Sequence, residues 1–242
     1  ILPGNVASAT ASTGYTVANS CRFNDDDSAE MTKSFGSGNQ KTFTVSFWVK
    51  RGSLAETDFH ILNTRASDND RFHILFYQND LWVINVSGGS TTLQFITDRK
   101  FRDPSAWYHI VVSIDTTQAT ESNRVKIYVN GTQETSFSTS TYPSQNDDMY
   151  VNNSGVTHYI GSNYSYNYFF DGYLAEFVFI DGTAYAASDF GEFDEDSPTI
   201  WKPIDVSGLT FGTNGTYLDF EASDNLGNDA NGGTDLTEAN LD

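Results

Sequence analysis

The chain has 242 residues, of which 38% are hydrophobic and 14% aromatic, and its 32 Asp and Glu residues against 13 Lys and Arg residues give a formal net charge of −19. This charge predicts no binding to nucleic acid, because a phosphate backbone repels an acidic protein that has no basic stripe. The longest apolar runs, residues 110–114 and 174–180, are far shorter than the ~20 residues that cross a bilayer, so we expect no membrane insertion. The composition also excludes a disordered tail, and the length suits two small domains or one large β domain.

The cysteine content and the first residues limit how the fold is held together. Cys21 is the single cysteine, so an internal disulfide is excluded and a core or bound ions must stabilise the fold. We interpret Cys21 as a small buried hydrophobic residue. The chain begins at Ile1 without the charged and apolar regions of a signal peptide, which suggests a processed product or an excised fragment.

Apolar residues recur with a period of two along most of the chain, which predicts β-strands. In residues 42–50, Phe43, Val45, Phe47 and Val49 lie on one face, which we expect to face the core. Similar runs bring the total to about a dozen strands; they are residues 20–24, 29–35, 59–63, 71–78, 81–87, 91–97, 107–115, 124–130, 156–161, 172–181 and 216–221.

The connections between these runs predict an antiparallel arrangement. Residues 78–80 (Gln-Asn-Asp) and 130–131 (Asn-Gly) tolerate positive φ and are typical of hairpin turns. A helical turn is expected only near residues 183–190. These features predict an all-β, antiparallel two-sheet jelly-roll sandwich that extends over residues 1–242 as a single domain. Residues 224–242, rich in Asp, Asn and Gly, are expected to form a C-terminal loop or a last strand.

Three segments resemble laminin-G-like, concanavalin A-like domains. They are the Trp-x-His strand and the Tyr-Val-Asn-Gly strand within residues 107–131, the tryptophan strand at residues 46–50, and the closing strand at residues 170–177. The order of these segments is also that of the family. The resemblance implies a concanavalin A-like sandwich, a fold that carries lectins and glycoside hydrolases.

A narrower resemblance links the chain to laminin-G-like segments of virion structural proteins from marine tailed phages. It rests on residues 23–28, 188–192, 217–220 and 226–229. It implies a location in the virion, on a tail, fibre or head appendage, with other virion proteins as partners. The absence of disulfides agrees with assembly in a reducing host cytoplasm.

Catalysis is the first function to weigh, because glycosidases of this fold carry carboxylates that alternate along one strand. The nearest match, residues 192–196 (Glu-Phe-Asp-Glu-Asp), ends in Asp where the acid/base Glu is required, and a solvated acidic loop is the simpler interpretation. His60, His73 and His109 stand in no nucleophile or zinc motif, so each is interpreted as a sheet histidine. We therefore expect a protein that is not an enzyme, with a diverged glycoside hydrolase as the least favoured alternative.

Calcium is a more plausible ligand of this chain than zinc, because it takes six to eight oxygen ligands and suits carboxylate-rich turns. Candidate turns are residues 24–27, 147–148 and 224–235. Relatives of this fold often bind calcium at loop ends, so the resemblance favours Asn24, Asp25 and Asp27. The alternative is a polar turn without an ion.

Residues 162–168 alternate Tyr with Asn and Ser, which suits a sugar or protein surface because rings stack while amides and hydroxyls hydrogen-bond. The predicted ligand-binding residues are Asn163, Tyr164, Tyr166, Tyr168 and Trp82, and Trp48 could add to them if it points outward. The first hypothesis is a non-enzymatic module that attaches a phage to a host-surface glycan or receptor as one of several symmetric copies, a homo-oligomer that gains by avidity. The alternative is a structural or decoration module whose tyrosines form subunit contacts.

Overall fold

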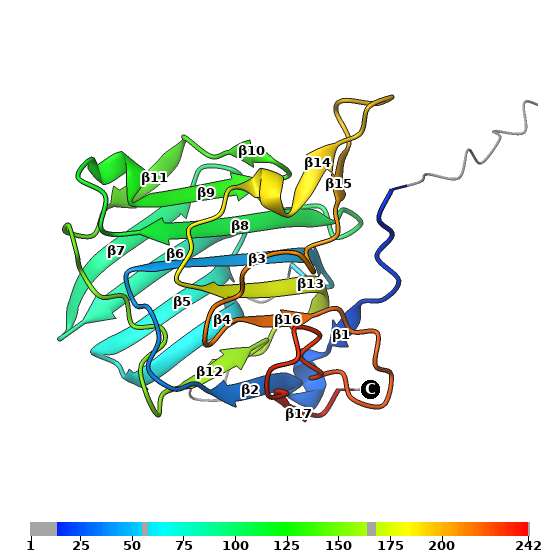
Figure 1. Ribbon diagram of the computed structural model, residues 1–242, viewed down its shortest axis with the longest axis horizontal. Helices are drawn as coiled ribbons and strands as arrows, with labels where there is room; N and C mark the ends of the chain where they lie inside the picture. The colour runs from blue at the N-terminus through cyan, green and yellow to red at the C-terminus, as the bar shows by residue number, and fades with distance from the viewer. Residues whose placement is uncertain (1–13, 55–57, 164–167, 242) are drawn as a thin grey trace, which may run out of the picture.

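The protein is described by a computed structural model in residues 14–54, 58–163 and 168–241. Within these residues, strands β1 to β17 form two large sheets packed face to face and one small hairpin, and every pairing is antiparallel (Figure 1). The all-β sandwich predicted from the sequence is therefore confirmed.

One sheet, called sheet A, has seven strands. Along it follow β1 (Cys21–Phe23), β13 (Gly172–Asp181), β3 (Thr42–Arg51), β8 (Tyr108–Asp115), β9 (Val125–Val129) and β10 (Thr132–Gln133), and β16 (Thr216–Leu218) shares the β1 edge of β13. Sheet B has eight strands, in the order β11 (Phe137–Thr141), β7 (Ser90–Thr97), β6 (Asp80–Ser87), β5 (Asp70–Tyr77), β4 (Asp58–Ser67), β12 (Thr157–Ile160), β2 (Glu30–Ser34) and β17 (Thr237–Ala239).

The remaining elements are short. Strands β14 (Gly191–Phe193) and β15 (Trp201–Pro203) form a hairpin that projects from the body of the sandwich (Figure 1). Three 3₁₀ turns are η1 (Asp25–Asp27), η2 (Glu121–Asn123) and η3 (Ala187–Asp189), of which η3 lies in the predicted helical turn. The dozen predicted strands are all present, and β17 is the last strand that was one alternative for residues 224–242. Strands β10, β11, β14 and β15 were not predicted, because each is short and lacks an alternating apolar pattern.

The main core lies between the two sheets. Phe43, Val45, Phe47 and Val49 are all 0% exposed, so the face predicted from their spacing is the core face. The ring of Phe43 on β3 meets that of Phe72 on β5 edge-on at 5.5 Å, which joins the two sheets. Burial of each such side chain contributes about 1.5–3 kcal/mol.

The outer face of sheet A carries a second hydrophobic cluster. Thr44 and Ser46, on the face of β3 opposite the core, are buried as well, so this face is not solvated as simple alternation predicts. The cause is the segment 183–217, which crosses the outside of the sheet and packs apolar side chains on it. The cluster consists of Val111, Val178 and Ile180 from the sheet, with Ala187, Phe190, Val206, Phe211 and Tyr217.

The described residues contain no helix long and apolar enough to cross a membrane.

A buried histidine makes the fold sensitive to acid. The Nε2 atom of His158 accepts a hydrogen bond from the Asn152 backbone N–H at 3.2 Å, and Nδ1 donates to the Val156 carbonyl at 3.2 Å. Burial lowers the pKa of His158 to about 3. In the unfolded chain its pKa is ~6.5, so below that pH the unfolded state takes up a proton that the folded state does not.

We therefore expect this contribution to stability to be complete above pH 6.5 and to be lost as the pH falls towards 3. At pH 5 the loss is about 2 kcal/mol from His158. Urea unfolding of the wild type and of His158→Gln at pH 7 and pH 5 measures it, because the difference between the two proteins removes all other titrating groups. An equal pH dependence in both proteins would contradict the assignment.

Candidate functional site: a tryptophan-lined cleft

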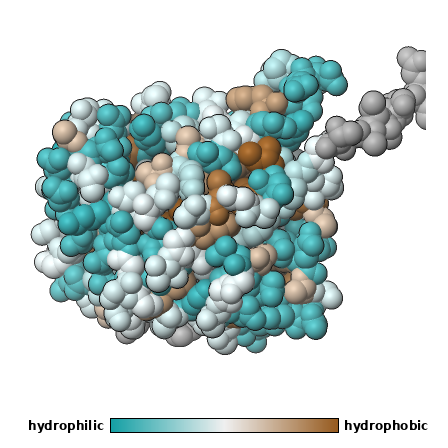
Figure 2. All heavy atoms as spheres, viewed as in Figure 1, coloured by the Kyte–Doolittle hydropathy of each residue, from teal (hydrophilic) through white to brown (hydrophobic). Residues whose placement is uncertain are grey.

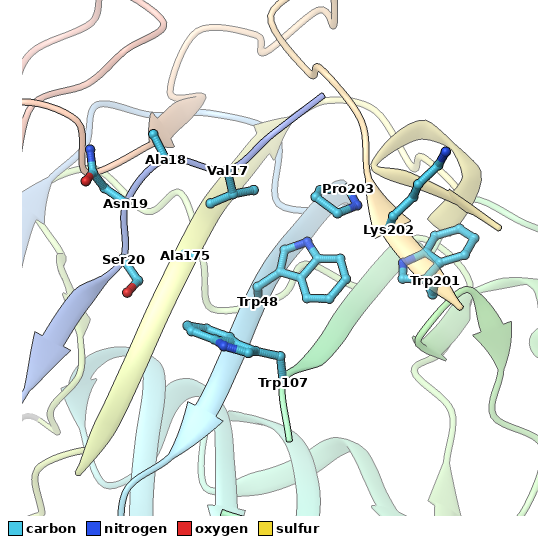
Figure 3. A pocket seen from close by; sticks show the side chains of 10 residues that line it. All are labelled: Val17, Ala18, Asn19, Ser20, Trp48, Trp107, Ala175, Trp201, Lys202 and Pro203. Atoms are coloured by element: carbon cyan, nitrogen blue, oxygen red, sulfur yellow. The ribbon is translucent and has the colours of Figure 1, made fainter. Parts of the chain in front are cut away.

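A cleft of about 370 Å³ opens on the outer face of sheet A, between the segment 17–20 that precedes β1 and the hairpin strand β15 (Figure 3). We call it the tryptophan cleft, because three of the four tryptophans of the chain line it. Its walls are Val17, Ala18, Asn19, Ser20, Trp48, Trp107, Ala175, Trp201, Lys202 and Pro203.

Strand register places Trp48 at the floor of the cleft. Its neighbours Phe47 and Val49 point into the core, so Trp48 points outward. On one side it faces Ala175 of β13 and on the other His109 of β8. Because the Ala175 side chain is a single methyl group, it leaves space beside the indole, and this space is part of the cleft.

His109 holds two of the three tryptophans. Its ring is 1% exposed and stacks on Trp48 at 4.9 Å. The Trp201 indole N–H donates to His109 Nδ1 at 2.9 Å, so the proton of the imidazole is on Nε2, which donates to Ser46 Oγ at 2.9 Å. Burial lowers the pKa of His109 to about 3, which keeps the ring neutral and this arrangement intact near neutral pH.

Two glycines give the Trp201 indole its place. A Cβ atom added at Gly131 would lie 2.3 Å from the indole, and one added at Gly191 would lie 2.6 Å from it. Gly131 also has φ of +77°, in the left-handed region that favours glycine. The ring is therefore confined by backbone on one side and by His109 on the other.

Trp107 forms the outer rim. It lies directly before β8 and is 37% exposed. Its ring is 6.5 Å from that of Tyr173, which in turn lies under the Arg22 guanidinium at 5.3 Å. Arg22 is paired with Asp171 at 2.5 Å. The exposed indole is thus supported from behind by packed side chains.

A buried carboxylate fixes the wall formed by residues 17–20. A β-bulge in β13 gives Glu176 a φ of +49° on the outer face of the sheet. The hydroxyl of Tyr217 donates to Glu176 Oε2 at 2.6 Å, and that of Tyr15 donates to the same atom at 3.0 Å. Burial raises the pKa of Glu176, and the two hydroxyls oppose this rise. Tyr15 thereby anchors the segment that leads into the cleft wall.

Charge in the cleft is small and locally balanced. Among the described residues, Lys202 is the only ionisable one that lines the cleft, and its ammonium group lies 3.3 Å from Glu192 and 3.5 Å from Asp194. The rest of the lining consists of indole rings, small apolar side chains and the polar side chains of Asn19 and Ser20. Figure 2 shows hydrophobic residues gathered on this face near the base of the β14–β15 hairpin, surrounded by hydrophilic surface.

The ligand-binding residues predicted from the sequence lie elsewhere. Trp82 is half-buried on β6 of sheet B and packs on Tyr77 at 4.8 Å. Tyr168 is 46% exposed and stacks on His60 at 6.2 Å, whereas Asn163 is 3% exposed and belongs to no open surface. Tyr164 and Tyr166 lie outside the described residues.

The predicted calcium turn is the 3₁₀ turn η1. The Asn24 amide donates to the Asp27 carboxylate, and the Asp25 pKa is raised by burial and then by the charge of Asp171. Oxygen ligands of this kind suit calcium. Across residues 14–54, 58–163 and 168–241, however, no three His, Cys, Asp or Glu side chains are grouped to hold a metal. Calcium at Asn24, Asp25 and Asp27 remains a prediction.

Sequence reasoning missed two of the three cleft tryptophans. Trp48 carried a signal, since it is an aromatic residue on the outward side of an alternating strand. Trp107 precedes its strand and Trp201 lies in a three-residue strand, so no periodicity marks either one. Their convergence with Trp48 depends on contacts between segments about 60 to 150 residues apart, which a local pattern does not contain.

The structure is thus an antiparallel β-sandwich with an open aromatic cleft on one sheet. The family model for the concanavalin A-like lectin/glucanases superfamily matches residues 23–188, more than half of the chain. The chain belongs to this superfamily, as the resemblance of residues 46–50, 107–131 and 170–177 implied. No curated protein sequence matches it.

Solved structures share the fold at low sequence identity. The chain is similar to a Bacteroides ovatus protein assigned as a carbohydrate binding protein (TM-score 0.58, 15% identity, 92% of this chain and 58% of that chain). It is also similar to domains LG4-5 of the mouse laminin alpha1 chain (0.50, 13%, 86% and 49%) and to the enzymatically active domain of bacteriophage CBA120 tailspike protein 2 (0.51, 11%, 78% and 30%). The chain spans about half the length of the first two.

The close contact of Gly191 with the Trp201 indole provides a test of the site geometry. Gly191→Ala places a methyl group against the indole, so we expect a loss of about 1–3 kcal/mol in unfolding free energy together with a changed near-UV circular dichroism spectrum. Gly208→Ala is the control, since nothing lies within 4 Å of its new Cβ. An unchanged spectrum in Gly191→Ala would show that the ring is not confined as described.

Proposed function

We propose that the protein is a non-enzymatic carbohydrate-binding module and that the tryptophan cleft is its binding site. The observation that carries this proposal is the convergence of Trp48, Trp107 and Trp201 on one open cleft. Aromatic faces pack against the C–H faces of a saccharide ring, and polar groups such as Asn19 and Ser20 can hydrogen-bond its hydroxyls. Since His109 and the two glycines hold the rings in place, little entropy is lost on binding.

The chemistry around the cleft supports binding without catalysis. Ser46 and His109 resemble the serine and histidine of a catalytic triad, but Ser46 is buried. In addition, His109 Nδ1 accepts a hydrogen bond from the Trp201 indole, whereas in a triad this atom donates to a carboxylate. Glu192 and Asp194 of the acidic segment are engaged with Lys202. The raised pKa of Glu176 arises in a packed contact with Tyr217 and Tyr15, not on a cleft wall.

The setting we propose is a virion appendage that attaches a phage to a cell-surface glycan or receptor, in several symmetric copies. The resemblance of residues 23–28 and 188–192 to phage structural proteins supports this setting, and so does the fold shared with a bacteriophage tailspike domain. A module that serves only as a structural contact is the alternative. It would bury the tryptophan cleft against a neighbouring subunit and bind no saccharide.

Single tryptophan variants distinguish these functions. A glycan array identifies the saccharide that binds best, and isothermal titration calorimetry then measures its affinity. We expect Trp107→Ala to weaken binding about tenfold, because a stacked aromatic contact contributes about 0.5–1.5 kcal/mol beyond its buried area. Trp82→Ala, on sheet B, should leave the affinity unchanged.

Melting temperatures of both variants provide the folding control. Loss of affinity in Trp82→Ala alone would move the site to the surface predicted from residues 162–168. A chain that binds no saccharide on the array and forms oligomers through this cleft would favour the structural alternative.

The calcium site predicted at Asn24, Asp25 and Asp27 is testable by stability. A ligand that binds only the folded state at a hundred times its Kd adds ~2.7 kcal/mol, and we expect calcium to raise the melting temperature by several degrees over EDTA. Asp25→Asn should abolish the rise and Glu195→Gln should retain it. Equal melting temperatures with calcium and with EDTA would refute the site.

A further inference from the structure

A second groove lies on the outer face of sheet A, on the β14 side of the hairpin, whereas the tryptophan cleft lies on the β15 side. It consists of two adjoining hollows of about 390 Å³ and 250 Å³, both lined by Tyr128 and Ala186. We call it the Tyr128 groove. Trp201 lines both the groove and the tryptophan cleft, so the base of the hairpin lies between the two.

One end of the groove is aromatic. Phe193 of β14 is 43% exposed, and its ring meets that of Trp201 edge-on at 4.9 Å. Tyr128 of β9 continues this surface towards the middle of the groove and is half-buried. When a ligand covers exposed rings of this size, removal of their apolar surface from water makes binding more favourable.

The other end is polar and carries opposite charges that do not pair. Asp115 at the end of β8 is held by the Thr117 N–H at 3.0 Å and by the Gln118 amide at 2.6 Å. Burial raises the pKa of Asp115, but these hydrogen bonds outweigh it, so the pKa lies below its ordinary value and the group is ionised. Lys126 on β9 lines the same hollow and forms no ion pair with any described residue.

We propose that the Tyr128 groove is a second saccharide-binding site, which shares only the Trp201 indole with the tryptophan cleft, and that its ligand is uncharged and rich in hydroxyl groups. The rings of Tyr128, Trp201 and Phe193 provide stacking surface. Lys126 is a hydrogen-bond donor and the fixed Asp115 an acceptor, so hydroxyls can bridge both. A neutral hydroxyl group can accept from the ammonium group and donate to the carboxylate, whereas a charged ligand is attracted by one of the two and repelled by the other.

A domain with two sites engages a repetitive glycan surface more tightly than either site alone, because the second contact is intramolecular. This inference goes beyond the proposed function, since the groove shares with the cleft only the Trp201 indole. It assigns the two sides of one hairpin to two saccharides.

Calorimetric stoichiometry tests the groove. The probe is a neutral oligosaccharide selected on the glycan array, titrated into the full chain. We expect two sites in the wild type. Trp107→Ala should weaken the cleft site about tenfold and leave the groove site unchanged, and the double variant Lys126→Met/Phe193→Ala should weaken the groove site and leave the cleft site unchanged. Trp201→Ala should weaken both sites, and so should the combination of the first two variants, which covers the case that Trp201→Ala does not fold.

The outcomes separate the two proposals. One site in the wild type, weakened in Trp107→Ala and unaffected by Lys126→Met/Phe193→Ala, would overturn the groove and leave the tryptophan cleft. One site weakened in Lys126→Met/Phe193→Ala and unaffected in Trp107→Ala would support the groove and refute the cleft. Binding of an anionic oligosaccharide at the groove as tightly as the neutral one would overturn the assigned ligand class.

Discussion

The structure depends on one constraint, which is that β8 and β13, two central strands of sheet A, carry apolar residues on both faces. Their inner face packs on sheet B. Their outer face carries Val111, Val178 and Ile180, which would be exposed on a sandwich of two sheets alone. Burial of these side chains requires a third layer, and the segment 183–217 supplies it. The hairpin β14–β15, the 3₁₀ turn η3 and strand β16 are all parts or direct neighbours of this layer.

The candidate site arises where that third layer ends. At the hairpin base the covering segment gives way to indole rings, which remain partly open to solvent. His109 belongs both to the covered outer face and to the site, because its buried ring supports Trp48 by stacking and fixes Trp201 by a hydrogen bond. The same packing that stabilises the outer face therefore orients the rings that a ligand would contact, and the hairpin divides the open part into a cleft and a groove.

The sequence predicted the inner architecture well and the outer layer poorly. Alternation in residues 42–50 identified the core face of β3 correctly, because every second side chain of a strand points to the same face and the residues on the core face are apolar. The near-continuous apolar runs at 110–114 and 174–180 belong to strands that the structure buries on both faces, as in other doubly covered sheets. What covers them was not predictable, since residues 183–217 have no regular period.

The sequence by itself determined the β class, the antiparallel turns, the core face and membership of the concanavalin A-like superfamily, since these follow from local periodicity and from motifs within single strands. Tertiary structure decided which aromatic residues share a surface. Trp82 and Tyr168 carried the strongest local signal, yet Trp82 lies on β6 of sheet B and Tyr168 lies in a loop against His60 of β4. Trp107 and Trp201 carried none and meet at Trp48. The physical reason is that a binding surface is assembled from strand register, a bulge beside Ala175 and two close glycine contacts, all of which are long-range packing.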